Sequence, residues 1–371
     1  MNDAPAPLDL KRIKVHALAL RQSLSRIENL LVDPGKAPLP CPPKISKLVD
    51  DCVGSISAAR KNNSSVILFY GAHLIKNGAQ KIVIELLERG LITHLATNGA
   101  GIIHDWELAF LGRTEESVKK NVATGSFGTW LETGRNIHLA ILAGAVRNEG
   151  FGRSLGRFIV EDGVELTDAT MLADSLRSEP THWLSPARAE LLQALTAQKI
   201  FGGRLEVKHP WKDSSIIAAA FRCGVPFTVH PGIGYDIISN HPMFSGAAIG
   251  RAADLDFRLL GGSIDNLDGG VVLSVGSAIM APQVFEKSLS CVNNLRLQAG
   301  KKIVRDHTMF VVDIQDGGNW DWSKGEPPKD NPAYYLRFCK SFSRMGGEMK
   351  YVQSDNVAFL HHVLKRLQVE S

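Results

Sequence analysis

The sequence predicts an α/β protein with a Rossmann-like parallel sheet and helices on both faces. Short apolar runs alternate with amphipathic helical stretches along most of the chain, which is typical of parallel sheets covered on both faces. Five of these runs end in Gly, Ser, Asn or Asp, as tight strand-to-helix turns require. No fixed-period repeat or low-complexity tract points to another architecture.

The first 60 residues differ from the remainder. Apolar residues at helical spacing predict a helix that starts near Asp9, with a stripe that faces the core or another subunit; the stripe is Leu20, Leu24, Ile27 and Leu31. Prolines in residues 38–43 interrupt it. A second helix follows, with Ile45 and Ile56 on its apolar face. We therefore expect an N-terminal helical arm over residues 1–60 and one large domain over residues 61–371.

The β-α alternation begins at residues 66–69, which read as a buried strand that runs into a turn at Gly71. A helix follows and ends at Gly90, the residue type favoured just past a helix C-terminus. Residues 91–101 hold a second strand and its glycine loop, and another helix begins at residue 102.

Downstream, residues 150–200 form a polar, charged region with helical patterning. Further strands are expected at residues 226–229 and within the stretches GGVVLSVG, MFVVDIQDGG and GEMKYVQSD, followed by a closing helix. No linker rich in Pro, Gly or Ser divides this part of the chain, so it is expected to fold as one domain.

Composition narrows the class of protein. With 44% hydrophobic and 22% charged residues the chain can fill a large core, and a net charge of +4 gives no reason to expect a nucleic-acid or membrane partner. The five cysteines are odd in number and never adopt Cys-x-x-Cys spacing, which indicates reduced thiols. No apolar run reaches the ~18 residues of a membrane span, and no signal peptide is evident. We expect a cytoplasmic location.

The glycine loops are the candidate ligand sites. In open parallel sheets, ligands settle beyond the carboxyl ends of the strands, where glycine lets the backbone approach a phosphate or ribose. The alternative is that tight turns need glycine whatever they bind. No loop has Gly-x-Gly-x-x-Gly spacing, and Gly150-Phe151-Gly152 reads as a plain turn. The loops are residues 70–73, 97–101, 232–236, 276–278 and 313–317.

These segments carry a family resemblance. The stretch ILFYGAHLIKNGAQKIVIELLERGLITHLATNGAGIIHDWELAFLG resembles the first nucleotide-binding segment of deoxyhypusine synthases, and GVPFTVHPGIGYDI resembles a later one. The stretch GGVVLSVGSAIMAPQVF stands where that family has a triple-glycine loop. The order of the blocks is kept over about residues 60–360. The resemblance implies a Rossmann-like domain that binds NAD and assembles as a homotetramer, with active sites shared between paired subunits.

By position, the resemblance assigns residues to the cofactor and to a small-molecule amine or amino-acid substrate. Asp236 falls on the acid that receives a substrate ammonium group, and a dry, carboxylate-lined pocket suits a cationic amine. The residues placed along NAD are Ala72, His73, Asn98, Gly99, Ala100, Gly101, Asp105, Gly276, Ser277, Asp313, Asp316, Ser354 and Asp355.

The family reaction oxidises spermidine with NAD and holds the aminobutyl group as an imine on a lysine. That lysine must be deprotonated, which burial or a nearby cation promotes. Lys340 has the expected spacing before the last strand, and Phe338, Cys339 and Phe342 are expected to desolvate it. Lys324 matches the family motif better in letters but comes too early. We predict Lys340 as the catalytic lysine, the alternative being a helix lysine that reaches solvent.

The chain departs from the family after the glycine loop, where a Lys-His-His segment is replaced by the apolar residues 279–283. A relative that handles another amine or amino acid fits better than a deoxyhypusine synthase. Three hypotheses follow: an NAD-dependent enzyme that oxidises an amine and transfers an imine, an ammonia-eliminating enzyme on an amino acid such as ornithine, and a catalytically silent nucleotide-binding tetramer. The second needs Arg113 or Arg135 placed for a carboxylate.

The histidines add one acid/base candidate. His73, His104 and His230 lie in or beside glycine loops, where a histidine can move protons near neutral pH. His104 stands next to Asp105 and is the predicted acid/base residue, with helix capping as the alternative. No histidine pair has metal-ligand spacing, so no metal is predicted. No nucleophile elbow, Walker loop or kinase signature is present.

Overall fold

The computed structural model describes residues 6–370. Its centre is a six-stranded sheet in the order β10-β9-β8-β2-β3-β7, in which every neighbouring pair runs parallel. This confirms the α/β fold with a Rossmann-like parallel sheet. The strands are β2 (Val66–Tyr70), β3 (His94–Thr97), β7 (Phe227–Val229), β8 (Val271–Val275), β9 (Thr308–Asp313) and β10 (Glu348–Gln353).

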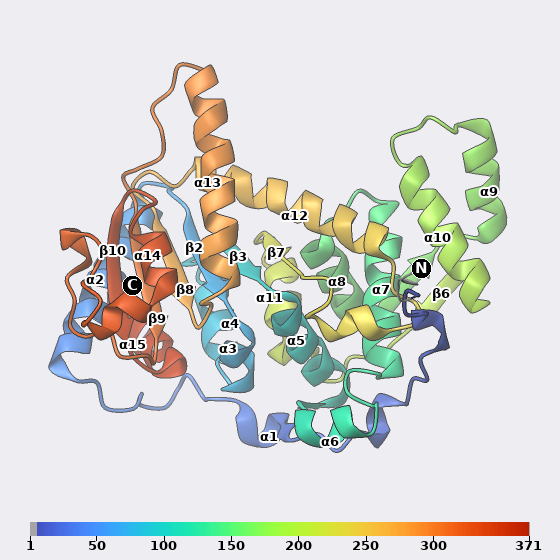
Figure 1. The fold of residues 1–371 in the computed structure, drawn as a ribbon, viewed down its shortest axis with the longest axis horizontal. Helices are drawn as coiled ribbons and strands as arrows, with labels where there is room; N and C mark the ends of the chain where they lie inside the picture. Colours follow the sequence, from blue (N-terminus) through green and yellow to red (C-terminus); the bar gives the residue numbers. More distant parts are fainter. Residues whose placement is uncertain (1–5, 371) are drawn as a thin grey trace, which may run out of the picture.

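The chain builds the sheet outward from β2 in two directions (Figure 1). From β2 it passes to β3 and then β7 at one edge, and it returns to place β8, β9 and β10 on the other side of β2. Counted from one edge, this is the 3-2-1-4-5-6 order of doubly wound dinucleotide-binding sheets. The order reverses between β2 and β8, and ligands of such sheets bind in the crevice at that point.

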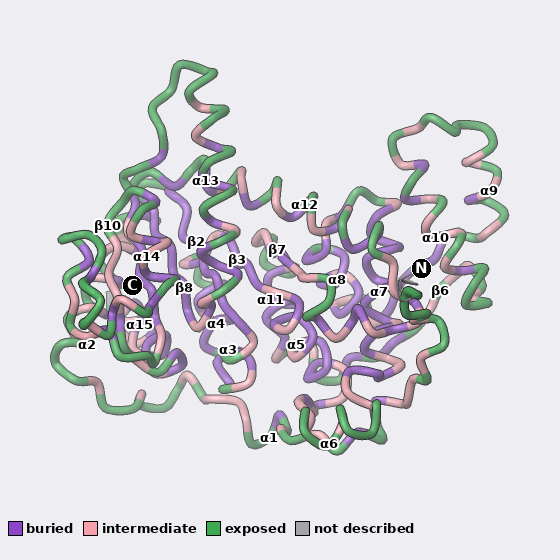
Figure 2. Tube along the Cα trace, viewed as in Figure 1, coloured by how far each residue is buried: buried purple, intermediate pink, exposed green. Residues whose placement is uncertain are grey.

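Alternate strand residues face two separate apolar layers. Val66, Leu68 and Tyr70 belong to one buried cluster, whereas Ile67 and Phe69 belong to another. Strands buried on both faces account for the apolar runs in the sequence, and Figure 2 shows the central strands β2, β3 and β8 as buried. The first layer includes α2 (Pro43–Lys61), α4 (Gln80–Glu88), α11 (Ile216–Arg222) and α15 (Asn356–Glu370). The second includes α13 (Met280–Gln298) and α14 (Arg337–Phe342), and α12 (Gly246–Asp265) contributes to both.

Residues between β3 and β7 form a mainly helical lobe. The helical region expected over residues 150–200 is present, but the antiparallel pair β5 (Gly163–Leu166) and β6 (Gly203–Glu206) was not foreseen. This pair closes the base of α9 and α10, which project from the body (Figure 1). The lobe contains α5 (Gly99–Leu111), β4 (Arg113–Thr114), α6 (Val118–Ala123), α7 (Leu131–Ala145), α8 (Phe151–Val160), α9 (Ala169–Ser178) and α10 (Ser185–Gln198). Short helical turns and 3-10 segments elsewhere are α3 (Ala72–Lys76), η3 (Lys212–Ser214), η4 (Ile237–Asn240), η5 (Trp322–Lys324) and η6 (Pro332–Tyr335).

The first helix expected in the N-terminal arm does not form. The segment is mostly extended, because its amides bond to distant parts of the chain: the Leu18 amide donates to the Glu132 carboxylate, and the Leu24 amide donates to the Glu115 carbonyl. Leu20 and Leu24 are 77% and 66% exposed. The segment contains η1 (Leu10–Arg12), η2 (Leu18–Leu20), β1 (Ser25–Arg26) and α1 (Ile27–Leu30). The second expected helix is present as α2.

A buried ion pair fastens this extended segment to the lobe. The Arg21 guanidinium donates two bonds to the Glu107 carboxylate, at 2.8 and 2.7 Å, and both side chains are 1% exposed. Thr114 and Thr133 hydroxyls donate to the same carboxylate. A bidentate pair with this support is satisfied in a low-dielectric setting. Among residues 6–370, no helix is long and apolar enough to cross a membrane.

Candidate functional site

The five predicted glycine loops lie at the end of the main sheet that is formed by the carboxyl ends of its strands. Because all six strands are parallel, the loops that follow them emerge on the same side. The sequence could identify each loop separately, and the strand order places those after β2 and β8 on either side of the point where the order reverses.

At that reversal point the two backbones are in close contact. A Cβ on Gly71 would lie 2.4 Å from the Gly276 carbonyl oxygen, so residue 71 must lack a side chain. Gly276 has a φ of +59° and lies against the Asn356 amide nitrogen, which a Cβ there would approach to 2.4 Å. Asn356 is 7% exposed, and its Oδ1 has no hydrogen-bond partner. Buried polar atoms are usually paired, so this free acceptor beside two glycines is a candidate contact for a ligand donor.

The start of α5 is arranged differently from a phosphate-binding loop. Asn98 accepts a bond from the Gly101 amide, in the manner of a helix N-cap. The Asp236 carboxylate lies against the same turn, so that a Cβ on Gly99 would be 2.2 Å from its Oδ2. Asp236 also accepts bonds from the backbone amides of Gly232 and Ala100. The amides of Ala100 and Gly101 therefore already have acceptors within the protein.

Asp236 is the predicted substrate-binding acid, and it is buried beside the predicted cofactor loop. Burial raises its pKa to about 6, against the opposing effect of the Gly232 and Ala100 bonds. It is 4% exposed, whereas its neighbours Ile233 and Tyr235 are 62% and 68% exposed. The structure thus brings Asp236 together with Gly99 and Ala100, a contact between segments far apart in the sequence.

His104 and Asp105 have separate hydrogen-bond partners. Asp105 is fully buried and accepts bonds from the Ser215 hydroxyl and from the first amides of α11, at 2.5 to 3.2 Å. Burial raises its pKa to about 6. His104 instead contacts the Thr114 hydroxyl through Nδ1 at 2.7 Å, and burial lowers its pKa. Asp105 anchors α11, and His104 joins the network around Glu107.

The remaining predicted cofactor residues lie close to the strand ends with local partners. Asp313 accepts a bond from the Gln315 amide, and Asp316 accepts one from the Gly318 amide. Asp355 accepts bonds from two amides at the start of α15. The Ser277 hydroxyl accepts a bond from the Ala281 amide. Ala72 and His73 begin α3 and are half-buried and exposed, respectively, while Ser354 is half-buried after β10. Contact of these residues with a cofactor stays a prediction.

Neither candidate lysine points to the reversal point between β2 and β8. Lys340 Nζ bonds the Glu326 carboxylate at 2.6 Å and lies 3.3 Å from the centroid of the Tyr334 ring. The residues expected to desolvate it, Phe338, Cys339 and Phe342, are buried against the sheet. Lys324 is 69% exposed in its side chain, as expected for a loop lysine.

His230 belongs to a buried polar chain between β3, β7 and α12. Its Nε2 lies 3.1 Å from the Thr228 hydroxyl, which also contacts His94 Nε2 at 3.0 Å. His94 Nδ1 contacts the Ser263 hydroxyl at 2.8 Å. Burial lowers the pKa of His94 to about 3 and that of His230 to about 4, so both rings are neutral at physiological pH. Within residues 6–370, no three metal-ligating side chains cluster.

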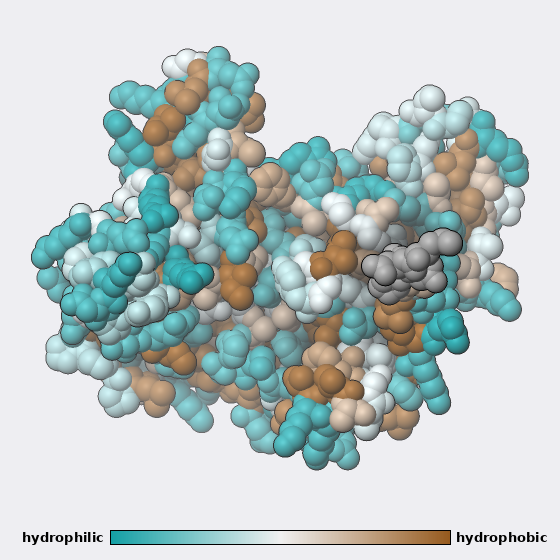
Figure 3. Space-filling model, in the orientation of Figure 1, coloured by the Kyte–Doolittle hydropathy of each residue, from teal (hydrophilic) through white to brown (hydrophobic). Residues whose placement is uncertain are grey.

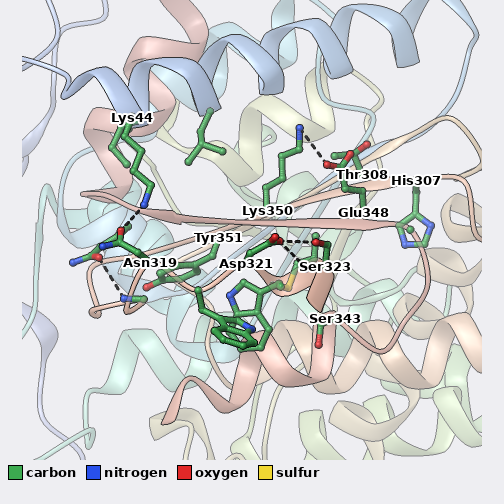
Figure 4. Close-up of a pocket in the computed structure, with 18 of the residues that line it drawn as sticks. Lys44, His307, Thr308, Asn319, Asp321, Ser323, Ser343, Glu348, Lys350 and Tyr351 are labelled. Atoms are coloured by element: carbon green, nitrogen blue, oxygen red, sulfur yellow. Dashed lines mark hydrogen bonds and ion pairs between the residues drawn. The ribbon is translucent and has the colours of Figure 1, made fainter. Parts of the chain in front are cut away.

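A large cavity lies elsewhere, along the edge strand β10 (Figure 4). It has a volume of about 980 Å³. Gly317, at the end of the predicted loop over residues 313–317, lines it, but none of the residues assigned to catalysis or to the cofactor does. The sequence could not identify it because nothing in residues 348–353 shows that this strand is at an edge. The paired tryptophans of NWDWS were the available signal, since Trp320 and Trp322 both line the cavity. A second cavity, of about 420 Å³, lies between α12 and α13.

Comparisons with known proteins give only distant likenesses. No protein-family model matches the chain, and no curated protein matches it. Among solved structures it is similar to AgrE in complex with ornithine and NAD+, at 14% identity and a TM-score of 0.46, covering 90% of this chain and 34% of that one. It is also similar to ArgZ, an arginine dihydrolase from cyanobacteria, at 14% identity and a TM-score of 0.43, covering 88% and 33%.

Two further solved structures are similar at the same level. One is a conserved LOR/SDH protein from Methanococcus maripaludis S2, at 12% identity and a TM-score of 0.42, covering 96% of this chain and 76% of that one. The other is a protein assigned as a deoxyhypusine synthase from Entamoeba histolytica, at 9% identity and a TM-score of 0.39, covering 87% and 88%. The chain spans about a third of the length of AgrE and ArgZ. No residue role is transferred from these proteins.

Proposed function

We propose that the chain is an NAD-dependent enzyme that acts on a small amine or amino acid, with the cofactor in the crevice between β2 and β8. The observation that supports this most is the contact of Gly71 with Gly276 at the reversal of strand order, beside the unpartnered Oδ1 of Asn356. Glycine lets a backbone approach a dinucleotide closely, and a free carbonyl oxygen suits a ribose hydroxyl. The resemblance to deoxyhypusine synthases supports the same cofactor.

Asn356 and Asp236 have different proposed roles, one toward the cofactor and one toward the substrate. NAD, when bound, supplies the acceptor for a hydride. Asn356 accepts a hydrogen bond that orients the cofactor, and Asp236 holds the substrate's ammonium group. Because the pKa of Asp236 is about 6, its side chain is mainly a carboxylate at pH 7 and above. The start of α5 fits an anion less well, since its amides are bonded to Asn98 and Asp236.

Two chemistries remain for the substrate. In the first, the neutral Lys340 amine would add to the imine left by hydride transfer to NAD and expel the departing amine. The alkyl group would then pass to an acceptor amine, and return of the hydride would reduce the product imine. In the second, the enzyme releases ammonia from an amino acid, which needs a cation for the carboxylate. Arg113 and Arg135 favour this second candidate, because among the described residues no carboxylate lies within ion-pair distance of either. Both are half-buried rather than fully solvated.

Calorimetric titration with NAD tests the cofactor site. We expect saturable binding in the wild type, and Asn356→Ala should weaken it about fivefold to tenfold, the equivalent of one hydrogen bond. Asn294→Ala is the matched control, because Asn294 is exposed near the C-terminal end of α13, whose opposite end follows the crevice residue Gly276. Absence of NAD binding at millimolar concentration, or equal affinity of both variants, would contradict the proposal.

Assembly as a homotetramer is also proposed, from the resemblance and from exposed apolar surface. Leu20 and Leu24 project from the extended N-terminal segment, and apolar residues are visible at several places on the face in Figure 3. Packing these side chains against another subunit would remove them from water. Sedimentation velocity at micromolar concentration should show a tetramer, and Leu20→Ser with Leu24→Ser should shift the distribution to smaller species. A stable wild-type monomer would rule it out.

A further inference from the structure

Strand β10 has one side of its backbone unpaired. It is the last strand of the sheet, and among the described residues no other strand pairs with its outer side. The amides of Glu348 and Ser354 donate to carbonyls at the ends of β9. Because the direction alternates along a strand, the N–H and C=O groups of Met349, Tyr351 and Gln353 point outward.

This free edge is the floor of the 980 Å³ cavity, with a wall on each side. The start of α2 forms one wall with Lys44, Ile45 and Leu48, and the loop after β9 forms the other with Trp320 and Trp322. Figure 4 shows Lys44 and Lys350 on one side of the strand, with Tyr351 and Asp321 on the other. Lys44 Nζ reaches the Asn319 side chain at 2.5 Å, linking the two walls.

Two buried polar side chains that line the groove have no partner. His307 is 3% exposed, and neither ring nitrogen makes a hydrogen bond. Trp322 is 6% exposed, and its Nε1 is likewise unpaired. The His307 ring packs edge-on against Phe285, and burial lowers its pKa to about 4, so it is a neutral donor and acceptor at pH 7. Unpaired buried groups are rare, and here they border an open groove.

We propose that this groove binds an extended, uncharged peptide segment of a partner protein, which adds to the sheet as a seventh strand beside β10. An added strand bonds the outward backbone groups of the edge, and its side chains alternate between the two walls. At about 3.3 Å per residue, the six residues of β10 offer an edge about 20 Å long. The charged side chains of the groove balance, three cations against three anions, which suits a peptide without net charge. They are Lys44, Arg305, Lys350, Asp306, Asp321 and Glu348.

A partner segment fits this groove better than two other occupants. Edge-to-edge pairing of β10 with β10 of a second copy would bring the flanking walls of both copies together, with α2 against α2 when the two strands are antiparallel. The first described residues of this chain lie at the opposite end of the molecule in Figure 1. The chain that follows α1 reaches the groove only as part of its wall, at Pro42 and the start of α2. The inference does not depend on the cofactor crevice, because none of Gly71, Gly276 or Asn356 lines the groove.

A random octapeptide display library, panned on the full-length protein, is the probe. We expect enriched peptides that are uncharged and rich in β-branched or aromatic residues. The tightest one is synthesised and added to the protein, and backbone amide exchange is followed by mass spectrometry with residue-level fragmentation. Exchange at Met349, Tyr351 and Gln353 should slow about tenfold or more on binding. Protection elsewhere, or none, would overturn the proposal.

Two matched pairs test the strand geometry. The peptide is N-methylated at alternate residues in either of two registers, and only the register that faces β10 should lose binding.

In the protein, Met349→Pro removes an outward N–H without removing a bond to β9, so it should abolish binding while circular dichroism stays that of the wild type. Trp320→Ala in the wall should weaken binding in a chain that keeps the whole edge. Equal binding by both methylated peptides, or a concentration-dependent dimer that competes with the peptide, would refute a peptide-binding edge.

Discussion

The Asp236 carboxylate lies against the α-carbon of Gly99, where any Cβ would be 2.2 Å from Oδ2. Asp236 belongs to the loop after β7, and Gly99 is the first residue of α5 after β3. A helix N-terminus favours negative charge because its first amides lack helical partners. Here a side chain of the protein supplies that charge, in the loop that the sequence assigns to a cofactor.

Replacing Gly99 tests this contact. Gly99→Ala should lower the free energy of unfolding by about 1–3 kcal/mol, because the new methyl group displaces the carboxylate from the amide of Ala100. Gly250→Ala on the exposed face of α12 is the control, since a Cβ there meets nothing within 4 Å, and it should be neutral or stabilising by about 0.5–1 kcal/mol. Urea denaturation gives both values.

A double-mutant cycle tests whether the cost of Gly99→Ala comes from the clash with Asp236 or from another constraint on the start of α5. In the Asp236→Ala background, Gly99→Ala should cost about 1 kcal/mol less than in the wild type, because its collision partner is gone. Additive losses would mean that Gly99 is constrained by something other than Asp236.

The buried Asp256 carboxyl group should make the free energy of unfolding depend on pH. Its carboxylate accepts bonds from the amides of Gly152 and Val229 at 3.0 and 2.8 Å, and burial raises its pKa to about 7. A carboxyl that holds its proton more tightly when folded contributes stability that is present below about pH 4 and lost as pH rises through 7. Asp256→Asn removes this titration, so the wild type should gain up to about 1.4 kcal/mol per pH unit relative to the variant as pH falls from 7 to 4. Parallel pH profiles of the two proteins would contradict the shifted pKa.

Breaking the buried ion pair between Arg21 and Glu107 should strongly lower the stability of the protein. Arg21→Met leaves the Glu107 carboxylate buried without its cation and should cost about 3–5 kcal/mol. Arg26→Met removes an exposed arginine from the same segment and should change stability by no more than about 0.5 kcal/mol. Thermal unfolding compares them, and limited proteolysis should cut the segment faster only in the first variant. Equal stability of the two variants would mean that the pair contributes little.

Substitution of Lys340 tests whether the enzyme transfers an alkyl group through a lysine imine. Lys340→Arg keeps a cation beside Glu326 and Tyr334 but cannot form an imine. It should therefore stop turnover without changing NAD affinity, whereas Lys324→Arg should leave turnover intact. Borohydride trapping with NAD and candidate amines, followed by peptide mapping, locates any adduct. An adduct at Lys324 would show that the spacing argument was wrong, and ammonia release without an adduct would favour the eliminating enzyme.

Most of the sheet could be predicted from the sequence because its strands are local signals. Residues 66–69 are a continuous apolar run followed closely by Gly71, and residues 271–275 are apolar except for Ser274 and have glycine on both sides. Both are in strands. The helix expected from Leu20 to Leu31 failed because spacing alone cannot reveal distant partners. Arg21 and the neighbouring amides bond to residues about a hundred positions away, and those bonds hold the backbone extended.

The site was predictable only in part, for the same reason. Each glycine loop could be found from its own residues, but the contact of Asp236 with Gly99 depends on how β7 is placed beside β3. The groove at β10 was missed because edge position is a property of the whole sheet. His104 and Asp105 were paired by adjacency in sequence, yet successive helix residues point in different directions.

The pairing of β2 with β8 has a consequence for synthesis of the chain on the ribosome. Val66 is paired with Val271, although β3 and β7 are complete long before residue 271 emerges. A nascent chain can therefore assemble a half-sheet whose exposed border is β2, the most apolar strand and the future centre of the fold. Such borders invite pairing with other chains. Translation slowed while β7 is outside the ribosome and β8 is still in the exit tunnel should increase aggregation of the nascent protein, whereas a slowdown after β8 has emerged should have little effect.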